Sequence, residues 1–428
     1  MAGRSGARRE PKAARPASDT LWRDPNYRLF LTLQGLSALG DSFSYVAIPL
    51  LVLHQTGSVA QMGLITGLTG LASIVTGLFA GVVADRVDRR RLLVLTDVAR
   101  CVLFGSVPLV WLFATPLWLL YTVVPVAAVF SMLFEVTFVT VVPGIVGPDR
   151  VLKANSHLFG TYAVASAAGP MLAGAIAAVL GPAAALGVDA ATFAVTAVGI
   201  LFVRIGATGA GPSGTPERRS VRREFLAGAR FLWAHPVLRP LTVLLALVTF
   251  LTDGLTDVIV YQVKQGLGHG DSSVGSVLAA AMVGTLIASL AVHRMRERLG
   301  FGVSWIGVHV LAGLAVACLG LAGSVPVVAV LAAVLRFCTG VAGINSMSLR
   351  QEVTPSHLLG RVTASFWTIH KALGPLGAAA VTAATGAWGV RIVCLVVGAC
   401  VVAVALSATA TGIGRTGRGC SGSGPSGA

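Results

Sequence analysis

Residues 81–90 read GVVADRVDRR, a basic segment that ends one apolar stretch, residues 60–84, and leads into another, residues 91–113. Each stretch is long enough to cross a membrane, because a spanning helix needs about 20 mostly apolar residues. Loops rich in Lys and Arg stay on the cytoplasmic side of a membrane. The segment therefore predicts a tight cytoplasmic connection between two membrane helices.

The composition extends this interpretation to the whole chain. Of its 428 residues, 55% are hydrophobic and only 11% are charged, whereas soluble domains carry about 25% charged residues. The net charge of +15 could indicate a nucleic-acid-binding protein. Such proteins gather their basic residues on one face, but here those residues are scattered between apolar runs. We therefore expect an all-α protein that crosses the lipid bilayer many times, with no nucleic-acid partner.

Stretches of spanning length occur in two sets of six. The first set covers residues 29–53, 60–84, 91–113, 117–141, 157–180 and 183–203. The second set covers residues 238–262, 274–293, 301–322, 325–347, 363–387 and 390–411. Twelve helices are therefore predicted, in a chain divided into a basic tail (1–28), a first half (29–204), a linker (205–237), a second half (238–411) and a second tail (412–428).

The linker begins with Gly, Ser and Pro residues and continues as an amphipathic pattern. From Glu217 to Trp233, apolar residues recur at helical spacing and arginines occupy the other faces. This predicts a helix lying on the membrane surface, with a solvated linker helix as the alternative. Basic residues concentrate in the tails, the linker and the connections on the same side, and only Lys264 and Arg391 fall at the opposite connections. By the positive-inside rule, both termini are expected in the cytoplasm, with the protein in the cytoplasmic membrane.

The two halves contain the same sequence feature at corresponding positions. Gly169-Pro170 in the first half and Gly374-Pro375 in the second are each followed by an Ala-rich run. Repeated six-helix halves joined by a linker are typical of transporters that rock between two access states.

The basic segment resembles the signature of the major facilitator superfamily, G-x-x-x-D-R-x-G-R-[RK]. The matching residues are Gly81, Asp85, Arg86, Arg89 and Arg90. Asp88 replaces the usual Gly, and this replacement, together with residues 189–193, is similar to the drug-exporter branch that contains macrolide and siderophore exporters. The resemblance covers about residues 25–412 and implies the twelve-helix major facilitator fold.

The signature also suggests a gate. Small Gly81 allows two helices to approach closely, and Asp85 can pair with basic groups or with a helix N-terminus. In the family that the segment resembles, the last arginines of the motif pair with an acid near the cytoplasmic end of the fourth helix, which implies an Arg89–Glu135 latch. We expect these contacts in one gating state only; the alternative is that the arginines only set topology.

A second signature lies in the predicted fifth helix. The exporter pattern G-x8-G-x3-G-P-x2-G-G is matched by Gly169, Pro170 and Gly174, and small residues stand where it has further glycines. Close helix packing and a proline hinge are therefore expected there.

Ionisable residues inside the predicted spans are candidates for function, because charge in a membrane is costly. Asp41 lies thirteen residues after Arg28, about 20 Å along a helix and near the middle of the membrane. It is the leading candidate for proton coupling, with a structural hydrogen bond as the alternative. Asp253 and Asp257 lie one turn apart and can share this role, unless Asp257 is solvated near Tyr261 at the outer interface.

The other intramembrane charges have different explanations. Asp97 and Arg100, three residues apart, are expected to form an internal pair. Arg336 and Lys371, with His370, can attract an anionic substrate or neutralise the acids.

Motifs of ATP hydrolysis and of common hydrolases are missing from the sequence. It contains no G-x-x-x-x-G-K-[ST], H-E-x-x-H or G-x-S-x-G, so no enzyme of those classes is indicated. We expect no cofactor and no metal, and we expect an ion or substrate gradient to supply the energy.

The sequence thus favours a monomeric secondary transporter that exports amphipathic small molecules, such as drugs, antibiotics or siderophores, in exchange for protons. The alternatives are an importer or facilitator of a metabolite or lysophospholipid, and a membrane sensor without transport.

Overall fold

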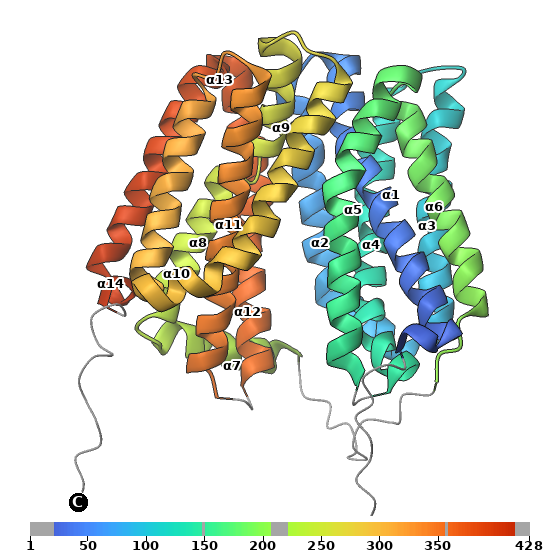
Figure 1. Cartoon of the computed structure of the whole chain (residues 1–428), viewed down its shortest axis with the longest axis horizontal. Helices are drawn as coiled ribbons and strands as arrows, with labels where there is room; N and C mark the ends of the chain where they lie inside the picture. Colours follow the sequence, from blue (N-terminus) through green and yellow to red (C-terminus); the bar gives the residue numbers. More distant parts are fainter. Residues whose placement is uncertain (1–20, 148–149, 207–220, 356–357, 416–428) are drawn as a thin grey trace, which may run out of the picture.

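The computed structural model describes residues 21–147, 150–206, 221–355 and 358–415. Within these ranges the chain is helical almost throughout, and no strand occurs. Ten of the described helical stretches are long and apolar enough to cross a membrane. Figure 1 shows the long helices standing side by side. The fold is therefore an all-α, multi-pass membrane architecture, as the sequence predicted.

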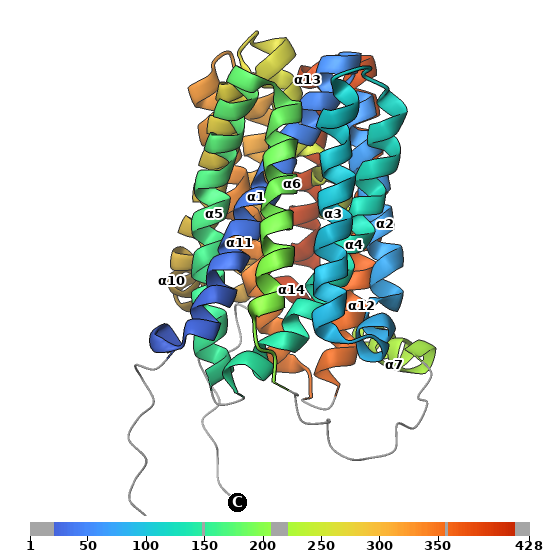
Figure 2. The same ribbon diagram turned by 90° about the vertical axis from the view of Figure 1, so that its right-hand side faces the viewer.

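The first group of helices contains α1 to α6. Their bounds are α1 Pro25–Thr56, α2 Val59–Arg86, α3 Arg89–Trp111, α4 Leu117–Val146, α5 Val151–Leu180 and α6 Pro182–Phe202. Local sequence separates α1 from α2, because Gly57 takes a positive φ of 62° and the Ser58 hydroxyl then caps α2 at the Gln61 amide. Figure 2 looks onto this group and shows its helices as one bundle.

The second group contains α8 to α13, with bounds α8 Leu238–Thr252, α9 Leu255–Tyr261, α10 Asp271–Leu319, α11 Val325–Val353, α12 Leu359–Ala372 and α13 Gly374–Ser407. A π-helical turn follows α9, and a short 3-10 helix and α14, Gly412–Arg415, follow α13. One glycine of positive φ divides each of the two longest helices, Gly300 (φ 73°) in α10 and Gly389 (φ 80°) in α13. The ten stretches, divided at these glycines, make twelve segments, which is the count that the sequence predicts.

The linker helix α7, Val221–Ala234, packs against α12 of the second group. Gly228 is so close to α12 that an added Cβ would clash with the carbonyl oxygen of Arg361. Leu232 is fully buried in an apolar cluster of the second group. The predicted helix is present from Val221, and its residues Gly228 and Leu232 pack on the second group; its expected start at Glu217 lies outside the described residues, and its position on the membrane surface stays a prediction.

The two groups meet in the part of the molecule away from α7. We call that part the far end, and the part that carries α7 the linker end (Figure 1). An added Cβ on Gly174 of α5 would lie 2.7 Å from the Cα of Gly275 in α10, and one on Gly67 of α2 would lie 2.8 Å from the carbonyl oxygen of Pro375 in α13. Small residues permit such close backbone contact. The largest apolar cluster accordingly contains residues of both groups.

Candidate functional site

A cavity of about 470 Å³ lies between the two groups of helices, and we call it the central cavity. Apolar side chains such as Ile48, Phe104 and Val124 form part of its wall. Polar and ionisable side chains of both groups form the rest: Asp41, Ser44, Tyr45, Thr66, Thr69, Ser73, Ser131, Asp253, Thr256, Asp257 and Arg336. A mixed lining of this kind suits a small molecule that has both apolar and polar parts.

Asp41 of α1 contacts both the central cavity and a buried arginine. Its side chain is 51% exposed, and one carboxylate oxygen lies 3.7 Å from Nη1 of Arg100 in α3. Arg100 is only 2% exposed and also forms an ion pair with the fully buried Asp97. Arg100 therefore links an acid that faces the cavity to an acid that is sealed inside the first group.

Two aromatic rings hold Arg100 in place. Its guanidinium carbon lies 4.1 Å from the ring centroid of Phe193 and 4.4 Å from that of Phe134. These contacts give cation–π attraction and keep water away. Because the Arg100–Asp97 pair is desolvated, removing either partner would leave an uncompensated charge inside the protein.

A further acid, Asp189 of α6, lies beside this pair. It is fully buried and accepts a hydrogen bond of 3.5 Å from the Thr192 hydroxyl. A Cβ added to Gly40 would lie 2.6 Å from its Oδ1, so Asp189 packs directly against the residue before Asp41. Glu135 of α4 is close enough to Asp41 for the two carboxyl groups to interact electrostatically.

We call these four carboxyl groups the acidic cluster: Asp41, Asp97, Glu135 and Asp189. Each lies on a different helix of the first group, namely α1, α3, α4 and α6. Asp41, Asp97 and Asp189 all interact electrostatically with Arg100, and Glu135 joins them through Asp41. Among the described residues, no group of His, Cys, Asp and Glu side chains could hold a metal ion. The cluster thus gathers three acids around one buried arginine, with Glu135 as a fourth acid beside Asp41.

Asp189 belongs to residues 189–193, which are similar to the exporter branch, but it was not among the site residues predicted from the sequence. The signal was present, because an aspartate in the middle of the span 183–203 is costly in a membrane. Glu135 was expected near the cytoplasmic end of its helix. It lies eleven residues before Val146, where α4 ends, which is about 16 Å along the helix, and its carboxyl group interacts with that of Asp41.

Polar contacts join the two groups across the central cavity. Arg336 of α11 donates to the hydroxyl of Tyr45 at 2.8 Å and to that of Thr256 at 3.3 Å. Thr66 of α2 donates to Asp257 at 2.8 Å, and Asp257 is only 2% exposed. Asp257 is therefore enclosed by protein and is not solvated at the outer interface.

The far end holds a polar contact between the groups. Asp271, the first residue of α10, lies 3.2 Å from Nε2 of His54 at the end of α1 and 2.5 Å from Nζ of Lys264. Lys264, one of the few basic residues that the sequence places at the far connections, thus has an acidic partner. A polar contact as well as close packing joins the two groups at the far end.

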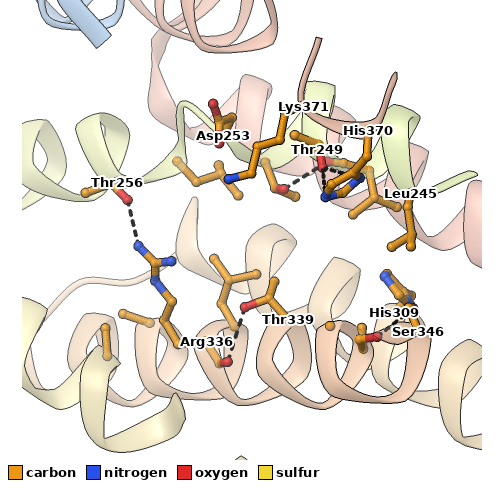
Figure 3. Close-up of a pocket in the computed structure, with 18 of the residues that line it drawn as sticks. Leu245, Thr249, Asp253, Thr256, His309, Arg336, Thr339, Ser346, His370 and Lys371 are labelled. Carbon is orange, nitrogen blue, oxygen red and sulfur yellow. Dashed lines mark hydrogen bonds between the residues drawn. The ribbon is translucent and has the colours of Figure 1, made fainter. Parts of the chain in front are cut away.

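A second cavity, of about 230 Å³, extends into the second group and shares Asp253, Thr256 and Arg336 with the central cavity. Figure 3 shows Asp253, His370 and Lys371 on one wall and Arg336 on the other. We call it the basic slot. Asp253 is exposed to it, whereas Asp257 is buried, so the two acids that lie one turn apart have different surroundings.

Residues 81–90 form the end of α2 and the start of α3 at the linker end. The Asp88 carboxylate accepts a hydrogen bond of 2.9 Å from the Arg91 amide and caps α3, which gives the acid at this position a structural role. A Cβ on Gly81 would meet nothing within 4 Å. The close approach expected at Gly81 is therefore not made in this conformation, and the side chain of Asp85 lies outside the described part.

The arginines of this segment differ in their surroundings. Arg89 donates to the carbonyl oxygen of Thr140 at 3.3 Å, Arg86 is exposed and Arg90 is half-buried. The ion pairs found among the described residues do not include Arg89 with Glu135 in this conformation. The latch stays a prediction for a different state.

The glycines and the proline of the exporter pattern in α5 lie where α5 contacts other helices. A Cβ on Gly169 would clash with the Cβ of Ser42 in α1. Pro170 lies within the helix, and a Cβ on Gly275 would clash with its carbonyl oxygen. Together with Gly174, these residues place α5 against both its own group and α10.

Comparison with known proteins decides the family. The sequence profile of the Major Facilitator Superfamily matches residues 30–379. The chain belongs to the major facilitator superfamily. Proteins of this superfamily are transporters and not enzymes.

This major facilitator protein has relatives with named activities. It is 25% identical to the multidrug efflux pump Tap of Mycolicibacterium fortuitum over 344 residues, 79% of this chain and 84% of the relative. It is 26% identical to the enterobactin exporter EntS of Escherichia coli O1:K1 / APEC over 363 residues, 84% of this chain and 83% of the relative. These matches confirm the predicted superfamily and the likeness to its drug- and siderophore-exporter branch.

Solved structures share the fold of this major facilitator protein. A bacterial homologue of the human lysosomal transporter Spinster, in an inward-facing and occupied conformation, has a TM-score of 0.74 at 15% identity and covers 94% of this chain and 98% of its own. The nucleoside transporter NupG has a TM-score of 0.73 at 12% identity, with coverage of 90% and 99%. At these identities the likeness concerns the fold alone.

Proposed function

We propose that this protein exports amphipathic small molecules across the cytoplasmic membrane in exchange for protons, by alternating access of the central cavity to the two sides. The observation that carries the proposal is the position of Asp41, which faces the central cavity and contacts Arg100 beside the acidic cluster. The relatives named as a multidrug efflux pump and an enterobactin exporter support export of such molecules.

The acidic cluster has the composition of a proton-binding site. Three of its carboxyl groups interact with the Arg100 guanidinium and Glu135 adds a fourth beside Asp41, and a surplus of negative charge inside a membrane protein is costly. Binding of a proton removes that surplus. Asp41 is the member that faces the cavity, whereas Asp97 is sealed in its pair with Arg100. A substrate that occupies the cavity beside Asp41 competes with the proton, and this competition couples the two fluxes.

The contacts between the two groups support alternating access. The distribution of basic residues supports a cytoplasmic linker end, and in this proposal the present conformation, closed at the far end, faces inward. In the opposite state the far-end contacts of Gly174 and Asp271 would open. The linker ends of the two groups would then approach, which allows the close contact predicted for Gly81, and the contact predicted for Arg89 with Glu135 would form between α3 and α4 within the first group. One chain supplies both halves, so a monomer suffices.

The test uses the purified protein in proteoliposomes that contain a pH-sensitive dye. Under an imposed pH gradient, we add erythromycin, tetracycline or a catecholate chelator and follow both proton and substrate movement. The wild-type protein should move protons opposite to substrate. Asp41→Asn should lose the proton movement and keep downhill substrate exchange. Glu297→Gln, which alters an exposed acid at the linker end, should behave like the wild-type protein.

The outcomes separate the candidate functions. Proton movement that persists in Asp41→Asn would show that another group carries the proton. Substrate and protons moving in the same direction would indicate an importer, and binding without flux would indicate a sensor. Elution of each variant as a single species in size-exclusion chromatography checks that it is folded.

A further inference from the structure

The basic slot carries more positive than negative charge. Arg336, Arg350 and Lys371 line it, and Asp253 is the acidic residue among its lining side chains. The ion pairs found in the described part of the chain include none of the three basic residues. His309 and His370 also face the slot, and each is hydrogen-bonded within the second group. The slot therefore offers basic side chains whose charge is not balanced by acids.

Arg350 is the most deeply enclosed of these basic residues. It is 1% exposed, and among the described residues its Nε and Nη1 have no hydrogen-bond partner. Its guanidinium carbon lies 3.5 Å from the ring centroid of Phe366, and Nη2 contacts the sulfur of Met347 at 3.1 Å. A ring and a thioether compensate a buried cation only in part. Arg350 therefore leaves uncompensated positive charge at the linker end of the slot.

Arg336 and Lys371 lie at the other end of the slot, near the central cavity. Arg336 is hydrogen-bonded to hydroxyl groups, which leave its charge unneutralised. Lys371 extends from the opposite wall (Figure 3), and both basic residues are close enough to Asp253 to attract it. One carboxylate is shared between two cations, so a second anionic group is needed to balance them.

We propose that the basic slot binds the anionic group of an amphipathic substrate, with Arg336 and Lys371 holding a carboxylate, sulfonate or phosphate. The apolar part of the substrate would lie against Leu245, Val248 and Trp367 of the slot. Arg350, about 21 Å from Arg336 along α11, adds positive potential that attracts the anion into the slot. This rests on the proposed function, because it specifies which amphipathic molecules that function would act on.

The test compares three dansyl probes that share one fluorophore: dansylglycine (anionic), dansylglycinamide (neutral) and dansylcadaverine (cationic). Binding to the purified full chain in detergent is followed by energy transfer from tryptophan. Dansylglycine should bind best to the wild-type protein. Lys371→Gln should weaken its binding roughly tenfold, since a hydrogen bond to a charged group is lost, and should leave dansylglycinamide unchanged.

Matched variants separate a local effect from a change in net charge. Lys371→Arg should keep the preference for the anion, and Arg294→Gln, which removes an exposed basic residue outside the slot, should not alter it. Arg350→Gln should weaken dansylglycine less than Lys371→Gln does. Equal binding of the three probes, a preference for the cation, or an unchanged preference in Lys371→Gln would overturn the proposal.

Competition identifies the source of the anion. Displacement of dansylglycine by decanoate indicates a soluble organic acid, and displacement by lysophosphatidylglycerol indicates an anionic lipid; both support the slot. Equal displacement by zwitterionic lysophosphatidylcholine would overturn it. These measurements concern binding alone. Absence of flux in proteoliposomes would contradict the proposed function but not the anion preference. Flux without a preference for the anionic probe would contradict the basic slot but not the proposed function.

Discussion

The acidic cluster of the first group and the basic slot of the second group have opposite charge, and both open onto the central cavity. Asp41, Asp97 and Asp189 interact with Arg100 in the first, where Glu135 adds a fourth carboxyl group beside Asp41, whereas three basic residues line the second together with one acid, Asp253. A surplus of carboxylates can be removed by protons, but arginine keeps its charge at all physiological pH values. The first group is therefore suited to protons and the second to an anion.

The comparison also concerns how firmly each arginine is held. Arg100 is enclosed by aromatic rings and ion-paired with Asp97, whereas Arg336 contacts hydroxyl groups beside a cavity. The first arrangement is a fixed part of the structure. The second can exchange partners when a ligand enters, because hydroxyl groups are neutral and replaceable.

The largest expected effect is on the stability of the protein when the arginine of either site is replaced. Arg100→Met should lower the free energy of unfolding by about 3–5 kcal/mol, because it leaves buried acids unpaired. Arg336→Met should lower it by about 1–2 kcal/mol, the loss of hydrogen bonds to a charged group. Denaturant unfolding in mixed micelles measures both. Adding Asp97→Asn to Arg100→Met should restore part of the loss, and equal losses for the two arginines would contradict the comparison.

At the far end the acid comes from the second group and not from the first. Asp271 of the second group contacts His54 of the first group there. Asp271→Asn should weaken far-end closure by about 1–2 kcal/mol and raise the outward-facing population roughly tenfold. Distances between spin labels on the two groups report this shift. Glu297→Gln is the control, and an unchanged distance distribution would show that packing alone closes the far end.

The smallest expected effect tests whether Glu135 belongs only to the acidic cluster. If it also forms the latch with Arg89 in the outward-facing state, Arg89→Ala and Glu135→Ala should each change the balance of states by about 0.5–1 kcal/mol, and the double variant should add little. The same spin-label distances measure the effect. Additive changes would restrict Glu135 to the acidic cluster.

Much of the fold could be predicted from the sequence, and less of the site. Apolar length and basic connections predicted the membrane helices, and the segment 81–90 predicted the superfamily. Intramembrane charge singled out Asp41, Arg336 and Lys371, which do line cavities. The sequence did not single out Asp189, and it did not indicate that the linker helix packs against α12.

The sequence by itself determined where the chain crosses the membrane, because the bilayer imposes a length and an apolar composition on each crossing independently of the others. Only the tertiary structure decided which polar groups meet. Thr66 and Asp257 are 191 residues apart, and Tyr45 and Arg336 are 291 residues apart. The physical reason is that membrane helices are apolar on most faces, so their periodicity does not reveal how each helix is rotated or which neighbour it contacts.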